Sequence, residues 1–401
     1  MLTIHAATTI LLENAVDFGT ESVHLTEAVG RVLAEPLIAD RDFPPFDRVT
    51  MDGIAIDYQA FAEGRRHFPI EGLQAAGAPQ LTLREPRHCL EVMTGAMLPQ
   101  GTDTVIRYED VIIEENIAKI QINDVIKGQN LHPKGSDRQR YNIIVNPNII
   151  ISPAELGVAA TVGKAELLVK KLPRMAIIST GDEIVEVTET PLAHQIRSSN
   201  AYALQGLLAK WGIQAKRLHL ADDEELIIKE LKKCLLEFDV LLLSGGVSEG
   251  KLDYVPKALK ILGVQQLFHK VQQRPGKPLW FGKASGGATV FALPGNPVSA
   301  FLCAMRYVEP WLRKSLGLVP IVEKFAILTE DITFKPDLTY FLQVQLHTDE
   351  QGRLLAKPLA GGGSGDLANL VAADGFLELP NGKALYAKGE VFRFWGYRSV
   401  G

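Results

Sequence analysis

Four cationic side chains lie within the short segment 270–283, at Lys270, Arg274, Lys277 and Lys283. Because the whole chain carries a formal net charge of −5, this segment is a local concentration of positive charge and not part of a generally basic surface. Clustered lysine and arginine side chains bind phosphate and other oxyanions through charge-assisted hydrogen bonds. The segment therefore predicts an anion-binding loop, although the residues alone also fit a solvated basic turn.

Two apolar runs beside this segment end in glycine-containing turns, VLLLSGG at 240–246 and VFALPGN at 290–296. Each run is followed by a helical pattern, so backbone N–H groups freed at the turn can meet an anion beside a helix N-terminus. Ordinary strand–helix loops remain an alternative, because an isolated glycine turn is a weak signal. The candidate ligand-binding residues of these turns are Ser244, Gly245, Gly246, Pro294 and Gly295.

Carboxylates follow other apolar runs of the same region, at Asp182, Glu183, Asp222 and Asp253. Carboxylate oxygens suit Mg²⁺, which together with lysines neutralises phosphate oxygens. The mixture favours phosphoryl or nucleotidyl chemistry over hydride transfer, since neither a GxGxxG motif after the first strand nor a GxxxxGK[ST] motif is present. Capping of a helix or a turn is the open alternative for each carboxylate.

The elements that would position these residues alternate between strand and helix from Met175 to about residue 320. The apolar strand patterns are MAIIST, IQAKRLHLADD, DVLLLSGG, VQQLFHKV and GATVFALPG. This alternation predicts a doubly wound parallel sheet. In such a sheet the C-terminal ends of the strands form the ligand crevice, so the cations, glycine turns and carboxylates are expected along one edge.

The rest of the chain shows separate helical and β-rich parts. Helical patterns occupy 3–18, 26–35 and 152–163, the last with Ser152 as N-cap and Glu155 completing a capping box. Alternating apolar and polar residues predict strands elsewhere. We therefore predict an α/β plus β multi-domain chain: a helical N-terminal and linker domain at 1–41 and 139–172, an inserted β-rich domain at 42–138, a doubly wound α/β domain at 173–320 and a C-terminal β-barrel-like domain at 321–401.

Composition excludes several classes of protein. A chain of 401 residues with 46% hydrophobic and 22% charged residues is typical of a globular protein with several domains. The net negative charge argues against nucleic-acid binding, and no apolar run is long enough to span a membrane. The three cysteines, Cys89, Cys234 and Cys303, lack metal-ligand spacing and are expected to pack as small apolar residues. Without a signal-peptide pattern, a cytoplasmic location is expected.

Several motifs occur together and in order along the chain. They are AVGRVLAE at 28–35, FDRVTMDGIAI at 46–56, MTGAMLPQGTDTVI at 93–106, STGDE at 179–183, SGGVSEGKLDY at 244–254, RPGKP at 274–278 and LPGNPVSA at 293–300. With these motifs the chain resembles the molybdopterin molybdenumtransferases, the MoeA family that includes the E domain of gephyrin. The resemblance covers nearly the whole chain.

The resemblance implies an enzyme of molybdenum cofactor biosynthesis. Such enzymes bind adenylylated molybdopterin and molybdate, use Mg²⁺, cleave the adenylate and release molybdenum cofactor and AMP. They are homodimers whose cleft lies between the α/β domain of one subunit and the β-domains of the other. Transient partners would be a molybdopterin adenylyltransferase and the enzymes that accept the cofactor.

The family's site residues can be transferred position by position. The implied catalytic residues are Asp52, Glu183, Asp222, Asp253, Lys270 and Lys277, with Glu183, Asp222 and Asp253 holding the metal. The implied substrate-binding residues, besides the two glycine turns, are Thr94, Asp137, Arg274, Ser299 and Ser364. Asp52 and Thr94 are expected to close the cleft across a dimer.

Four positions depart from the family pattern. Arg274 stands where the family has lysine, which exchanges a point donor for a planar fork. His132 and Gln343 replace arginines, and Ser198 replaces an aspartate. Because the main carboxylates and Lys277 are retained, an active enzyme is still expected.

Two other functions are compatible with parts of the sequence. The α/β part also resembles the smaller molybdopterin adenylyltransferases, which lack the β-rich insert and the C-terminal domain. A scaffold that binds a partner peptide, as the gephyrin E domain does, is the alternative from another class. ATP consumption with free molybdopterin would identify the first, and a folded chain without turnover would favour the second.

Overall fold

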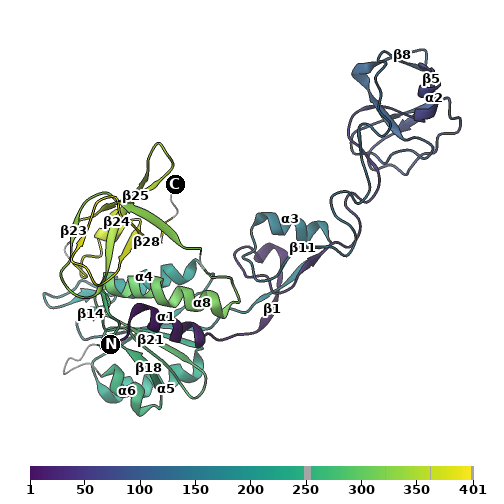
Figure 1. The fold of residues 1–401 in the computed structure, drawn as a ribbon. Coiled ribbons are helices and arrows are strands. Elements are labelled where there is room, and N and C mark those ends of the chain that lie inside the picture. Colours follow the sequence, from purple (N-terminus) through teal and green to yellow (C-terminus); the bar gives the residue numbers. More distant parts are fainter. Residues whose placement is uncertain (248–253, 321, 362, 399–401) are drawn as a thin grey trace.

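The computed structural model describes residues 1–247, 254–320, 322–361 and 363–398. The chain is extended, with a large body at one end and a small β-rich domain at the other (Figure 1). A connecting region that contains one helix lies between them (Figure 1). Within the described ranges no helix is long and apolar enough to cross a membrane.

The centre of the large body is a six-stranded sheet with the order β16-β13-β17-β21-β20-β18. The first four strands pair in parallel, whereas β20 and β18 pair antiparallel. The parallel prediction is therefore wrong for this edge, because the links before and after β20 are too short for a parallel crossover. The strands are β13 (Met175–Thr180), β16 (Lys216–Leu220), β17 (Val240–Ser244), β18 (Gln265–His269), β20 (Trp280–Lys283) and β21 (Thr289–Leu293).

Helices cover both faces of this sheet, as a doubly wound fold requires (Figure 1). One face packs α4, α7 and α8, and a π-helical segment joins α7 to α8. The other face packs α5 and α6. The predicted long helix after β21 is thus confirmed, with a π-helical middle. The elements are α4 (Ser199–Ala209), α5 (Glu224–Glu237), α6 (Val255–Ile261), α7 (Pro297–Cys303), the π segment η3 (Ala304–Val308) and α8 (Glu309–Ser315).

The first helix, α1 (Ile4–Glu13), was placed with the linker domain but packs on the α/β body. Its apolar positions Ile4, Ala7 and Leu11 are buried in the same core cluster as the α7–α8 side of the sheet. The sequence identified its apolar face, but spacing along one helix does not say which partner covers that face.

The linker region contains strands as well as a helix. The helix predicted at 26–35 is absent, because Gly30 adopts a φ of +81° and Leu33 bridges Val169. The helix α3 begins after Ser152 with the expected capping box from Glu155. The elements of the linker region are β1 (Thr20–His24), η1 (Leu25–Glu27), β2 (Leu37–Ile38), β11 (Ile143–Val145), α3 (Pro153–Thr161) and β12 (Glu166–Lys170).

The inserted domain is a six-stranded sheet with the order β7-β4-β6-β5-β9-β8, as its alternating pattern predicted. The strand β3, before this sheet in the sequence, pairs antiparallel with β10, which follows the sheet. The elements are β3 (Arg48–Val49), β4 (Gly53–Ile56), α2 (Tyr58–Ala62), β5 (His67–Gln74), β6 (Cys89–Val92), β7 (Thr104–Arg107), η2 (Tyr108–Asp110), β8 (Val111–Glu114), β9 (Ile117–Ile120) and β10 (Leu131–His132).

The C-terminal domain is a small barrel, since β24 pairs with both β25 and β26 and so closes the sheet. The strand β19 (Gln273–Arg274) pairs in parallel with β24 and attaches the cationic segment of the α/β domain to the barrel. The elements of this domain are β22 (Lys324–Leu328), β23 (Ile332–Thr333), β24 (Thr339–Thr348), β25 (Leu354–Pro358), α9 (Asn369–Ala372), β26 (Gly375–Leu379), β27 (Leu385–Tyr386) and β28 (Val391–Gly396). Two further short strands, β14 (Ile184–Val185) and β15 (Ile196–Arg197), pair with each other within the range of the α/β domain.

Candidate functional site

The glycine turns after β17 and β21 come into contact at the edge of the sheet. A Cβ atom on Gly245 would lie 2.7 Å from the Thr180 carbonyl oxygen, and one on Gly295 would lie 3.7 Å from the Gly245 Cα. Gly245 and Gly246 adopt φ values of +100° and +63°, which L-side chains rarely tolerate. The Gly245 N–H donates to the Leu293 carbonyl at 3.4 Å, so this amide is not available as we expected. The two turns nevertheless pack closely against each other and against Thr180.

Asn200, near the start of α4, links these two turns. Its Nδ2 donates to Ser244 Oγ at 2.9 Å and to the Gly295 carbonyl at 2.7 Å. Its Oδ1 and the Thr180 Oγ1 are both buried and have no hydrogen-bond partner within the described part of the chain. Buried polar atoms are normally satisfied, so the pair marks a place where a polar ligand is expected. The sequence reading missed Asn200 as a site residue, because one asparagine near a helix start has no characteristic spacing.

Two of the carboxylates at the strand ends, Asp182 and Asp223, accept backbone hydrogen bonds. Asp223 caps α5 through the Leu226 N–H at 2.8 Å, and Asp182 Oδ1 accepts the Asp222 N–H at 3.0 Å. The Asp182 contact holds the loops after β13 and β16 together, so Glu183 and Asp222 stand at the same edge. No group of three potential metal ligands occurs among the residues that the structure describes. Asp253, the third predicted ligand, lies outside them.

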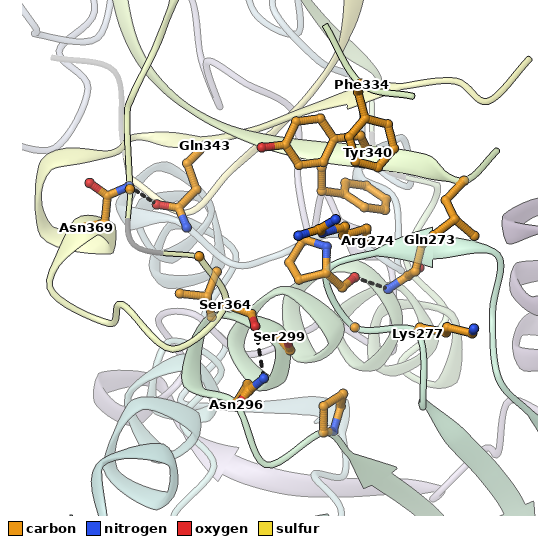
Figure 2. Close-up of a pocket in the computed structure, with 18 of the residues that line it drawn as sticks. Gln273, Arg274, Lys277, Asn296, Ser299, Phe334, Tyr340, Gln343, Ser364 and Asn369 are labelled. Carbon is orange, nitrogen blue, oxygen red and sulfur yellow. Dashed lines mark hydrogen bonds between the residues drawn. The ribbon is translucent and has the colours of Figure 1, made fainter. Parts of the chain in front are cut away.

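A cavity of about 670 Å³ separates the α/β domain from the barrel (Figure 2). Six of the predicted residues line it: Arg274, Lys277, Pro294, Gly295, Ser299 and Ser364. Its described lining includes two cations and no carboxylate, which makes it an electropositive pocket. The structure therefore brings the cationic loop and the LPGNP turn together, as the sequence predicted. Gly295 joins this cavity to the strand-edge turns.

Two side-chain pairs hold the walls of this cavity. Asn296 Nδ2 donates to Ser364 Oγ at 2.9 Å, which fixes the glycine-rich loop of the barrel against the α/β domain (Figure 2). Asn369 Nδ2 donates to Gln343 Oε1 at 2.5 Å on the barrel side. Gln343 is thus a neutral lining residue at a position where the family pattern has a cation.

The barrel wall also presents an aromatic surface. Phe334 and Tyr340 stack with ring centroids 4.3 Å apart and planes inclined by 10°. The Arg274 guanidinium lies 6.0 Å from the Phe334 ring centroid, within the range of a cation–π contact. Burial raises the pKa of Tyr340, so its hydroxyl stays protonated at neutral pH. A planar ligand next to Arg274 would meet this wall.

Lys270 is a predicted catalytic residue that does not line the cavity. It adopts a φ of +71°, and its backbone bonds to Leu2 and Leu279 fix the start of the cationic loop. Glu183 and Asp222 are not cavity-lining either. The predicted site therefore consists of two neighbouring groups, the strand edge and the cavity.

The predicted residues of the insert lie far from the cavity in the same chain (Figure 1). Asp52 Oδ1 accepts two hydrogen bonds from Thr94, which lower the pKa of Asp52, first through the backbone N–H and then through the hydroxyl. Asp137 Oδ1 lies 2.7 Å from His132 Nε2, and the other ring nitrogen of His132 lies 3.2 Å from Arg48 Nη2. One chain alone does not bring these residues to the cavity.

All three cysteines are buried and unpaired, as predicted. Burial raises the pKa of Cys89 to about 12 and also raises the pKa of Cys234 and Cys303. A thiol with so high a pKa carries almost no thiolate at neutral pH, so none of them suits nucleophilic or metal chemistry.

Three protein-family profiles match the chain in order. They are the MoeA N-terminal region (domains I and II) at residues 2–163, a probable molybdopterin-binding domain at 176–314 and the MoeA C-terminal region (domain IV) at 326–396.

Curated proteins and solved structures match over the same length. The molybdopterin molybdenumtransferase of a Synechocystis species is 44% identical over 99% of this chain and 100% of its own length. That of Staphylococcus epidermidis is 29% identical over 95% of this chain and 92% of its own. The crystal structure of the molybdopterin biosynthesis MoeA protein from Pyrococcus horikoshii superposes with a TM-score of 0.86 at 27% identity, covering 100% of both chains.

Proposed function

The chain belongs to the MoeA family, and from this premise we propose that it is a molybdopterin molybdenumtransferase of molybdenum cofactor biosynthesis. Its substrates are molybdate and adenylylated molybdopterin, and its products are molybdenum cofactor and AMP. The observation that carries this proposal is the electropositive cavity of about 670 Å³ beside the glycine turns. A tetrahedral dianion and a phosphorylated pterin are both anionic, and both suit such a lining.

Different residues of the site would bind different parts of the substrates. Arg274 offers a planar pair of donors and Lys277 a point charge, and together they attract molybdate. Ser299 and Ser364 add hydroxyl groups from opposite sides of the domain boundary. Asn200 Oδ1 and Thr180 Oγ1 are unsatisfied acceptors that suit the N–H groups of a pterin. Rate acceleration then comes mainly from positioning and charge neutralisation around the phosphoanhydride.

Mg²⁺ is the cation we propose for the strand edge. Glu183 and Asp222 provide hard oxygen donors there, and Asp253 is a third candidate beyond the described residues. Mg²⁺ commonly binds through one or two carboxylates together with substrate phosphates, so a group of three carboxylates is not required. When bound, the ion would neutralise the oxygens of the phosphoanhydride.

A homodimer is part of the proposal, because the insert, whose range includes Asp52, Thr94 and Asp137, lies at the opposite end of the chain from the large body (Figure 1). In a two-fold dimer the insert of each copy would reach the cavity of the other. The Asp52 carboxylate, held by Thr94, would then close the cleft over the bound substrate. A molybdopterin adenylyltransferase and cofactor-accepting enzymes would meet this dimer transiently in the cytoplasm.

The direct test is AMP release from adenylylated molybdopterin by the purified protein with Mg²⁺. We expect release that depends on micromolar molybdate. A control with free molybdopterin and ATP tests the adenylyltransferase alternative, which requires ATP consumption. A folded, dimeric protein that releases no AMP under any of these conditions would refute the transferase and favour a binding protein of the same fold.

A further inference from the structure

A second cavity, of about 200 Å³, lies where α1, α8 and the barrel meet. It shares no lining residue with the larger cavity. Four cationic side chains line it, Arg306, Arg313, Lys314 and Arg393, against the single carboxylate of Glu323. Within the described lining, one carboxylate stands against four cations, while Glu378 and Glu309 act on Arg306 and Arg313 from outside the lining.

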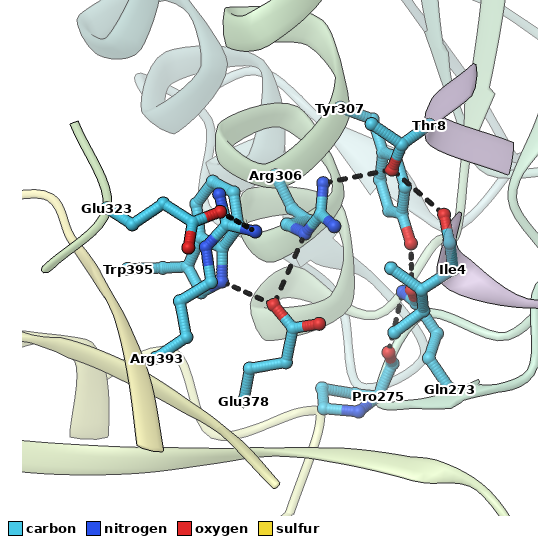
Figure 3. A network of polar contacts seen from close by, with 10 residues as sticks. All are labelled: Ile4, Thr8, Gln273, Pro275, Arg306, Tyr307, Glu323, Glu378, Arg393 and Trp395. Carbon is cyan, nitrogen blue, oxygen red and sulfur yellow. Dashed lines mark hydrogen bonds and ion pairs between the residues drawn. The ribbon is translucent and has the colours of Figure 1, made fainter. Parts of the chain in front are cut away.

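Arg306 is the most deeply buried of these cations, with only 4% of its side chain exposed. It comes from the π-helical segment η3, and its Nη1 lies 3.2 Å from Thr8 Oγ1 of α1 (Figure 3). Its Nε has no hydrogen-bond partner within the described chain. The Glu378 Oε2 atom lies 3.7 Å from this Nε, which is beyond hydrogen-bond length. A buried guanidinium with an unused donor is costly unless a ligand satisfies it.

Arg313 repeats this arrangement on the next turns of the helix. Its Nε is also buried and lacks a described partner, although its Nη2 donates to the Val319 carbonyl at 3.2 Å. Burial lowers the pKa of Arg313. Both arginines line the cavity, and in each the buried Nε has no partner among the described residues.

Arg393 completes the cationic wall from the barrel. Its guanidinium lies 4.2 Å from the Trp395 ring centroid, and that of Arg306 lies 4.3 Å from the same ring, so two cations share one indole (Figure 3). Burial and then repulsion by Arg306 lower the pKa of Arg393. Glu323 pairs with Arg393 at 3.0 Å, and Glu378 accepts from the Trp395 Nε1 at 2.6 Å. These carboxylates do not reach the Nε atoms of Arg306 and Arg313 within hydrogen-bond distance.

We propose that this second cavity binds a small oxyanion through Arg306, Arg313 and Arg393. The chemistry required is a phosphate or carboxylate group that accepts hydrogen bonds from two guanidinium groups at once. The volume equals roughly six or seven water molecules, which admits inorganic phosphate or a short dicarboxylate and excludes a nucleotide. Bound there, the anion would hold the η3–α8 helix against the barrel, because Arg306 and Arg313 come from that helix and Arg393 comes from β28.

The test follows the arginine Nε–H signals of the full-length protein by ¹⁵N–¹H NMR during titration with inorganic phosphate or with succinate. The signals of Arg306 and Arg313 are assigned from their loss in Arg306→Lys and Arg313→Lys. We expect both signals to move in a saturable way with at least one of the two anions. The anion that gives the tighter binding identifies the ligand as a phosphate or as a carboxylate.

Two variants of the second cavity and one control variant test where the anion binds. Lys314→Gln, at an exposed position that is safe for folding, should weaken the anion by several-fold, and Arg393→Gln by about tenfold or more. Lys277→Gln, in the other cavity, should leave the dissociation constant unchanged. The proposal is overturned if neither anion moves the two signals at millimolar concentration, or if the dissociation constant is the same in Arg393→Gln as in the wild type. Its failure would leave the transferase proposal untouched, because AMP release does not enter this experiment.

Discussion

Asp52 and Thr94 form a closed pair in the insert, in which one carboxylate oxygen of Asp52 accepts both the N–H of Thr94 at 2.7 Å and its hydroxyl at 2.8 Å. The two residues lie 42 positions apart in the sequence. The sheet of the insert joins them by pairing β4, which follows Asp52, with β6, which precedes Thr94. A fully exposed carboxylate is thereby held in one orientation, ready to face a ligand from outside its own domain.

This pair predicts a pH dependence of stability. Because Thr94 lowers the folded-state pKa of Asp52, the pair stabilises the fold above the unfolded-state pKa and loses this effect as pH falls through the folded pKa. The free-energy difference between wild type and Asp52→Asn should therefore shrink as the medium is acidified. Urea unfolding at a series of pH values measures it. A difference that grows on acidification would contradict the assignment.

The cationic loop predicts a matched comparison in the large cavity. Lys277→Gln removes a lining cation and should lower molybdate-dependent AMP release by roughly 10- to 100-fold. Lys283→Gln, in the same cationic segment but outside the cavity lining, should stay near the wild-type rate. Equal losses in both variants would mean that general charge, and not the cavity, attracts the substrate.

The Arg274 position predicts a change in binding more than in turnover. Arg274→Lys keeps the charge but removes the fork and the contact with Phe334. We expect the KM for molybdate to rise by several-fold while kcat changes little, since the chemistry lies at the phosphoanhydride. Steady-state kinetics at varied molybdate measure both. An unchanged KM would show that Arg274 does not contact the oxyanion.

The proposed dimer predicts complementation between two inactive variants. Asp52→Asn damages only the insert and Lys277→Gln only the cavity. Random mixing of equal amounts gives half mixed dimers, each with one intact site out of two, so about a quarter of wild-type activity should return. Co-refolded or co-expressed subunits test this. Absence of recovery in proven mixed dimers would place both residues in the same chain's site.

The close packing of the glycine turns after β17 and β21 predicts different effects of two alanine substitutions on stability. Gly245→Ala meets the Thr180 carbonyl oxygen at 2.7 Å from a φ of +100°, so it should destabilise the protein by roughly 1–3 kcal/mol. Gly286→Ala has open space within 4 Å and should change stability by less than about 0.5 kcal/mol. Thermal unfolding compares them, and equal effects would contradict the packing described for the turns.

Local sequence signals predicted those parts of the structure that local geometry determines. The capping box of Ser152 and Glu155 and the strands that end at Ser244 and Leu293 follow from short patterns. The helix expected at 26–35 failed because Gly30 takes a left-handed conformation, which a periodicity count does not register.

Long-range contacts were the part that the sequence did not reveal. The docking of α1 on the α/β body depends on a partner surface about 300 residues away, as the Arg306–Thr8 contact illustrates. The role of Asn200 depends on two turns meeting in space. Neither relationship leaves a pattern in the chain, because each is created only when separate elements pack together.

The three buried thiols have a consequence for following the motions of this protein. Cys89 lies in the insert and Cys234 on an outer helix, while Cys303 Sγ lies 3.6 Å from the Gly276 carbonyl in the wall of the large cavity. Each reacts with an alkylating reagent only when its own surroundings open. The labelling rate at each cysteine, resolved by peptide mass, would thus report separately how often the insert, the helical layer and the wall of the large cavity open.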